Sequence, residues 1–241
     1  MARIPESPEE IFGTFSNDVQ KVFGADLVAI ILFGSGARGQ YVRDRSDINF
    51  LIVLTQTGID RLHEALDLVA RWRKVKVAVP LFLTREYIDS ALDTFPIEFL
   101  DMKNFHKLVF GEDVLAGIQI DKNDLRRQIE RELRGKLIHL RSGFLSTGND
   151  RTELQNMLAA SVTAFIAIFE GLLYLKEQAI PDSKPKSFQE TAQLFGLDSL
   201  VFTQVMNIKR GEWRGSKIQV QGIAVSYIHE IKKLVEVVDK M

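Results

Sequence analysis

Two apolar runs on either side of a glycine-rich turn constrain the fold of this chain more than any other feature. The first run, Leu27–Phe33, ends directly in Gly34 and Ser35, and the second occupies residues 48–54. A short, nearly unbroken apolar run suits a strand buried on both faces better than a helix. The sequence therefore predicts two buried strands, with a glycine-serine turn at the end of the first.

The rest of the periodicity separates an α/β part from an all-helical part near residue 120. Ser7 as the cap of a capping box with Glu10, and Pro8 at the first helical position, predict a helix over 8–23. Helical spacing predicts a second helix over 58–73. Further strands are expected over 74–83, 97–101 and 108–110.

After residue 120 the apolar residues follow long helical periods. These periods predict long helices over 125–144 and 153–178, shorter helices near 187–208, and a final helix over 218–238. We therefore expect an α/β (α+β) domain with a mixed sheet over residues 1–120, followed by an all-α helical bundle over residues 121–241.

The composition is that of a globular protein and excludes several kinds of site. The chain has 241 residues, of which 46% are hydrophobic and 26% charged, and its net charge is -1. That balance argues against a general polyanion-binding surface, and no clear basic patch for nucleic acid is present. The absence of cysteine excludes disulfides, thiolate metal sites and a cysteine nucleophile. Because the N-terminus lacks the apolar run of a signal peptide, we expect a cytoplasmic protein.

One segment is apolar enough to raise the question of a membrane span. Residues 158–175 contain a single charged residue, Glu170. An ionisable group is costly in hydrocarbon, and the run is near the lower length limit for a span. We therefore interpret the segment as the central helix of the bundle and expect no membrane partner.

The residues that follow the first strand can hold phosphate. Glycine at position 34 lets the backbone approach a ligand closely, Ser35 offers a hydroxyl, and Arg38 adds a positive fork. Backbone amides of the turn, and of a helix expected to start there, would also donate to phosphate. Asp47 and Asn49 stand two positions apart at the second strand, so their side chains share a face that can hold a cation.

These motifs resemble the nucleotidyltransferase superfamily that includes DNA polymerase β. The segment GSGARG followed by SDI is similar to the minimal and kanamycin nucleotidyltransferases, and the fold resemblance covers about the first 120 residues. It implies that Gly34, Ser35 and Arg38 bind nucleotide, and that Asp47 and Asn49 hold Mg²⁺ or Mn²⁺. Asp47 would also be the catalytic carboxylate. The helical remainder resembles, in architecture, the bundle that follows the catalytic domain in the kanamycin enzymes.

The sequence departs from the family pattern at two of its three carboxylates. The second falls on Asn49, and the third is expected on the strand over 74–83, which contains no acid. Asparagine offers a neutral oxygen but adds no charge and accepts no proton. Replacement bases are available later in the chain: Glu98 and Asp101 on the strand expected there, and Glu130, Glu132 and Glu170 in the helical part.

Two functions follow from this pattern. The first is binding of a Mg-nucleoside triphosphate with transfer of a nucleoside monophosphate to a hydroxyl of a small-molecule or protein acceptor. The alternative is a catalytically inactive homologue that acts as a nucleotide-binding regulator or an antitoxin-like interaction scaffold. A second copy of the chain is a further candidate partner if the helical part presents a large apolar surface.

Overall fold

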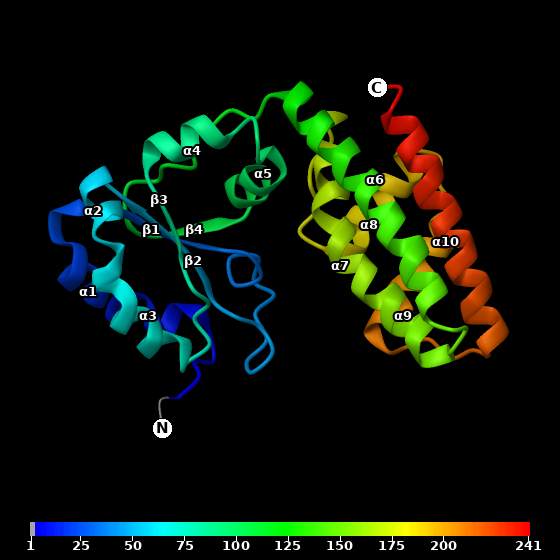
Figure 1. The fold of residues 1–241 in the computed structure, drawn as a ribbon, viewed down its shortest axis with the longest axis horizontal. Coiled ribbons are helices and arrows are strands. Elements are labelled where there is room, and N and C mark those ends of the chain that lie inside the picture. The colour runs from blue at the N-terminus through cyan, green and yellow to red at the C-terminus, as the bar shows by residue number, and fades with distance from the viewer. Residues whose placement is uncertain (1–2) are drawn as a thin grey trace. The chain divides into compact units, whose positions relative to one another are not determined.

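The computed structural model describes residues 3–241 and divides into two compact units (Figure 1). The first unit comprises the chain up to Asp93 together with Glu98–Ile120. The second comprises Thr94–Ile97 together with Asp121–Met241. The first unit holds the sheet, and the second is helical.

The sheet of the first unit has four strands in the order β3-β2-β1-β4. Strand β1 (Leu27–Phe33) pairs antiparallel with both β2 (Asn49–Leu54) and β4 (His106–Gly111). Strand β3 (Leu81–Leu83) pairs parallel with β2. The sheet is therefore mixed, as the sequence predicts, and the two predicted buried strands form its centre.

A glycine allows β4 to lie against β1. Gly111 pairs with Ala29 and has a φ of +79°. A Cβ added at Gly111 would lie 2.0 Å from the carbonyl oxygen of Val28. No side chain fits there, so the position requires glycine.

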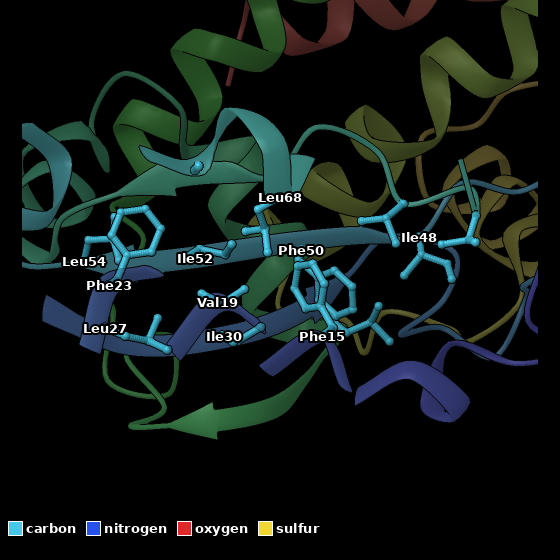
Figure 2. Close-up of a cluster of buried hydrophobic side chains, with 14 residues drawn as sticks. Phe15, Val19, Phe23, Leu27, Ile30, Ile48, Phe50, Ile52, Leu54 and Leu68 are labelled. Carbon is cyan, nitrogen blue, oxygen red and sulfur yellow. The ribbon is translucent and has the colours of Figure 1, made fainter. Parts of the chain in front are cut away.

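Helix α1 (Phe12–Phe23) covers one face of the sheet. Its buried residues Phe15, Val19 and Phe23 recur every fourth position and face the central strands (Figure 2). The ring of Phe15 stacks on that of Phe50, with 4.3 Å between their centroids. This packing explains why the segment is helical.

The predicted capping box at the start of this helix is wrong. Pro8–Ile11 forms a 3₁₀ turn, and the Ser7 side chain makes no capping hydrogen bond. The amide of Glu10 instead donates to the backbone carbonyl of Ser7, at 3.3 Å. The tighter turn therefore satisfies the amide that a serine side chain would otherwise cap.

The helix predicted over 58–73 is interrupted. It consists of α2 (Gln56–Asp60), a 3₁₀ turn (Leu62–Ala65) and α3 (Leu66–Arg73). Arg61, between the first two pieces, leaves the helical conformation and pairs with Asp26 at 2.9 Å. The helix therefore breaks at Arg61, where this ion pair forms, and the spacing of the apolar residues does not reveal the break.

Two predicted strands differ from the structure. Over 74–83, only Leu81–Leu83 forms a strand, with an isolated bridge from Val77 to Ile48. Lys76 has a left-handed φ of +69° and Pro80 lacks an amide hydrogen, so the ladder cannot continue through them. The strand predicted over 97–101 is instead helix α5 (Pro96–Asn104), which proline at its first position favours. Helix α4 (Arg85–Ala91) had no counterpart in the prediction.

The second unit is a bundle of five helices, as predicted. They are α6 (Lys122–Ser146), α7 (Arg151–Leu175), α8 (Lys184–Leu194), α9 (Ser199–Arg210) and α10 (Lys217–Val238). Helix α7 packs against the other four. It is also long and apolar enough to cross a membrane, although 56% of that stretch is buried inside the protein. Glu170 is buried within it and accepts a hydrogen bond from the Ser187 hydroxyl at 3.4 Å.

Candidate functional site

Residues 34–39, which we call the glycine turn, leave the end of β1 beside the start of β2. Gly34 has a φ of +71°, and a Cβ there would lie 3.2 Å from Nδ2 of Asn49. The preceding residue, Phe33, pairs directly with Asn49 in the sheet. The structure therefore brings together the glycine and the asparagine that the sequence singles out, with no side chain between them.

The turn is closed by its own backbone. The amide of Arg38 donates to the carbonyl of Gly34 at 3.2 Å, and that of Gln40 to Ser35 at 2.9 Å. The helix expected to start here is absent: residues 34–47 form turns and irregular backbone before the bridge at Ile48 and β2. Gly39 and Asp44 have left-handed φ values of +68° and +65°, which helical backbone does not allow. The turn therefore has no helix dipole to add to its amides.

Asp47 is the carboxylate of this site, and its side chain is 60% exposed. It precedes β2 by two residues, and Nδ2 of Asn49 donates to its backbone carbonyl at 3.4 Å. Its Oδ1 lies 4.0 Å from Nζ of Lys76. The carboxylate therefore faces an ammonium group from the neighbouring segment.

Lys76 is the site residue that the sequence reasoning missed. Its carbonyl accepts from the amide of Ile48 at 2.8 Å, and the carbonyl of Ile48 accepts from Ala78 at 2.9 Å. These two bonds place Lys76 alongside Asp47, on the segment where the family resemblance leads one to expect a third acid. The one available signal was the absence of any acid over 74–83, and nothing in that pattern indicated the left-handed φ of Lys76.

Arg38 faces away from solvent. Its side chain is 5% exposed, pairs with the carboxylate of Asp101, and lies 3.6 Å from the centre of the Phe105 ring. Asp101 is on helix α5, whereas the sequence reasoning placed it on a strand. The guanidinium thus connects the glycine turn to α5 by an ion pair, and to Phe105, directly after α5, by a cation–π contact.

The end of α5 is held by a second polar contact. Nδ1 of His106 lies 2.9 Å from the carbonyl of Met102, and its Nε2 lies 3.0 Å from Asp113. Partial burial acts to raise the pKa of Asp113, but the hydrogen bond and charge of His106 and two backbone amides outweigh it. The pKa of Asp113 is therefore lower than that of a solvated aspartate.

The other candidate bases have structural partners. Glu130 pairs with Arg126 and Arg134, and Glu132 pairs with Lys136, along α6. Glu98 lies on α5 rather than on a strand. These contacts give the carboxylates of α6 the surface ion pairs typical of a helix.

The side chains at the glycine turn do not fit a magnesium site. Asp47 is one carboxylate, Asn49 is neutral, and the third nearby group is the ammonium of Lys76. Within residues 3–241, no group of three or more histidine, aspartate or glutamate side chains could hold a metal ion. Mg²⁺ between protein and triphosphate takes one or two carboxylates, and here the one carboxylate already faces an ammonium group that would repel the ion.

The comparisons with known proteins concern the fold. No family model matches the sequence, and no curated protein matches it. Among solved structures, the chain resembles the crystal structure of a spectinomycin adenyltransferase from Enterococcus faecialis with ATP and spectinomycin. The TM-score is 0.50 at 14% identity, over 92% of this chain and 98% of that chain. The chain therefore shares the fold of that structure, an α/β part followed by a helical part, which confirms the predicted fold class.

Proposed function

We propose that this protein binds a nucleoside triphosphate at the glycine turn and acts as a nucleotide-binding scaffold rather than as an efficient transferase. The observation that carries the proposal is the close approach of the Gly34 backbone to Asn49, whose Nδ2 would lie 3.2 Å from a Cβ added at Gly34. Gly34 has no side chain of its own to keep a phosphate from its backbone, while the position that should carry a second carboxylate is neutral. Binding needs the turn, whereas transfer needs the acids.

The roles of the residues follow from their surroundings. Gly34 lets a phosphate approach the backbone, and the hydroxyl of Ser35 donates to it. Arg38 is held by Asp101 and Phe105, so it positions the turn from behind. Asp47 lies beside Lys76, and Asn49 lies beside Gly34. A partner protein or a second copy of the chain would then read the nucleotide-bound state.

Slow transfer of a nucleoside monophosphate to a hydroxyl is the second candidate function. It is favoured by the exposure of Asp47, whose carboxylate is accessible to an acceptor. Loss of a positioned general base costs on the order of 10² to 10⁴ in rate. Transfer would therefore be measurable only with long incubation and a sensitive assay for released pyrophosphate.

A thermal-shift titration tests the binding proposal without an acceptor. We expect one of ATP, GTP, CTP and UTP to raise the melting temperature, because a ligand that binds the folded state stabilises it. Ser35→Ala should reduce the shift. Ser226→Ala, which removes the same hydroxyl from an exposed position on α10, is the matched control and should leave the shift unchanged. If no triphosphate stabilises the wild-type protein, the proposal is wrong.

Asn49→Asp separates the two functions. The substitution restores the second acid of the family pattern at position 49, beside the backbone of Gly34. If the wild-type protein is a slow transferase, the variant should release pyrophosphate faster. If the variant releases none with any hydroxyl acceptor while the triphosphate still binds, the scaffold function stands.

A further inference from the structure

We propose that the ammonium of Lys76 takes the place of a divalent cation at this site, so that the protein binds the metal-free nucleoside triphosphate. The inference rests on the proposed function and specifies the form of the ligand. The family resemblance implies acids around a cation at this position, whereas the structure has the ammonium of Lys76 beside a single acid, Asp47. Lysine is a compact positive charge with three donors, which suits phosphate oxygens.

The backbone of Lys76 is held in an unfavourable conformation that fixes this placement. Its φ of +69° is rare for a residue with a long side chain. The conformation is maintained by the bond from Ile48 and by the amide of Val77, which donates to the carbonyl of Trp72 at 3.3 Å. Strain that the surrounding structure maintains is concentrated at functional sites. The left-handed turn is therefore consistent with a role for the side chain beside Asp47.

The ion pair between Lys76 and Asp47 is weak enough to open for a ligand. The two side chains are 39% and 60% exposed, and their charged atoms are 4.0 Å apart. Exposed pairs at such distances contribute little to stability. The ammonium can therefore leave Asp47 for a phosphate oxygen at a low energetic cost.

The charges beside the glycine turn favour an anion over a divalent cation. Asp47 and Lys76 together carry no net charge, and Asn49 adds none. A divalent ion would meet one carboxylate and a like charge beside it. A triphosphate would meet the ammonium and the backbone of the glycine turn, and only Asp47 would repel it.

Calorimetric titration of ATP into the full chain, once with excess EDTA and once with excess Mg²⁺, tests the proposal. We expect ATP to bind more tightly in EDTA than in excess Mg²⁺, because excess Mg²⁺ leaves little metal-free ATP, whereas a site that depends on a cation loses nearly all binding in EDTA. Lys76→Asn removes the charge but keeps a residue that tolerates left-handed φ. It should weaken binding in EDTA by about tenfold or more, as expected for a hydrogen bond to a charged group.

Two further variants protect the experiment against a folding defect and an unspecific charge effect. Lys76→Gly adopts left-handed φ without strain and should show the same loss as Lys76→Asn. Lys74→Asn removes a neighbouring exposed lysine and the same unit of charge, and should bind ATP as the wild-type protein does. If Lys76→Asn binds as well as the wild-type protein in EDTA, Lys76 has no such role.

The outcomes distinguish the role of Lys76 from the nucleotide-binding function on which it rests. If ATP binds only with Mg²⁺, the Lys76 proposal is overturned while the nucleotide-binding function stands. If no nucleotide binds under either condition, the proposed function fails and this inference fails with it. The double variant Asn49→Asp with Lys76→Asp supplies the missing acids, and its ATP binding should become dependent on Mg²⁺. If the double variant still binds ATP in EDTA as tightly as the wild-type protein does, the substitution of ammonium for cation is contradicted.

Discussion

The two sides of the glycine turn each carry an ion pair, and the pairs differ in burial. On the side of α5, Arg38 is 5% exposed and meets Asp101 and the Phe105 ring. On the side of β3, Lys76 and Asp47 are both substantially exposed. The two ion pairs should therefore differ in their effect on stability. Removing one partner of a buried pair leaves an uncompensated charge. Removing one partner of an exposed pair lets water solvate the other, with little change in the free energy of unfolding.

This difference indicates which substitutions should change the stability of the first unit and which should change its affinity for phosphate. Changes on the α5 side should lower the free energy of unfolding of the first unit. Changes on the β3 side should alter the affinity for phosphate while leaving unfolding almost unchanged. Four substitutions test the contrast, and each can be followed in the first unit alone, because Trp72 lies there and Trp213→Phe silences the other tryptophan of the chain.

Asp101→Ala should have the largest effect on stability. It removes a carboxylate from a guanidinium that is almost fully buried, and because Asp101 is itself partly exposed we expect a loss of about 2 kcal/mol. Urea unfolding followed by Trp72 fluorescence measures the loss. Asp89→Ala, on the exposed surface of α4, is the matched control and should change stability little. Equal effects of the two substitutions would remove the contrast between the two sides of the turn.

Gly34→Ala should lower the free energy of unfolding by about 1–2 kcal/mol. The alanine has to adopt the left-handed φ of Gly34, and its Cβ would lie 3.2 Å from Nδ2 of Asn49. Gly39→Ala has a similar φ but meets no atom within 4 Å, so it carries the conformational cost alone. The difference between the two unfolding curves measures the contact with Asn49. No difference would mean that Asn49 moves aside freely.

Acid should weaken the α5 side through Asp113. Because the pKa of Asp113 is lowered in the folded protein, its contribution to stability is present above the ordinary value of about 3.9 and is lost as pH falls through the folded value. Asp113 is partly exposed, so the loss should stay under about 1 kcal/mol. Urea unfolding at decreasing pH should show a smaller pH dependence in Asp113→Asn. An unchanged dependence would exclude Asp113 as a source.

Lys76→Asn should have the smallest effect on unfolding. The lost pair is exposed, and asparagine tolerates the left-handed φ better than lysine, so the change should stay within about 0.5 kcal/mol. The same variant should nevertheless lose affinity for ATP. A large loss of stability here would place Lys76 with the structural residues of the α5 side.

The sequence predicted the parts of the fold that depend on local periodicity. The runs that became β1 and β2 are apolar because helices and neighbouring strands bury them, and the long helical periods became α6, α7 and α10. Residues 97–101 were misassigned because a short apolar run with a proline before it suits a strand or a helix equally well. The tertiary environment decided between them.

The candidate site was predictable only in part for a similar reason. Gly34, Asp47 and Asn49 lie on chain segments whose strand context the sequence reveals. The direction of Arg38 depends on Asp101 and Phe105, which lie far along the chain, on α5 and directly after it. The place of Lys76 depends on one unusual backbone angle, for which lysine gives no signal. Residue types were therefore visible, whereas the partners that determine their roles were not.

The order of the strands also bears on how the first unit reaches its folded state. One side of β1 pairs with β2, which follows soon after it, but the other side pairs with β4, at the far end of the unit. During synthesis that second edge stays open until β4 emerges, and an open apolar edge is a template for pairing with other chains. Contacts between distant segments also form slowly. Aggregation of nascent chains should therefore depend on how soon Gly111 can settle against Val28.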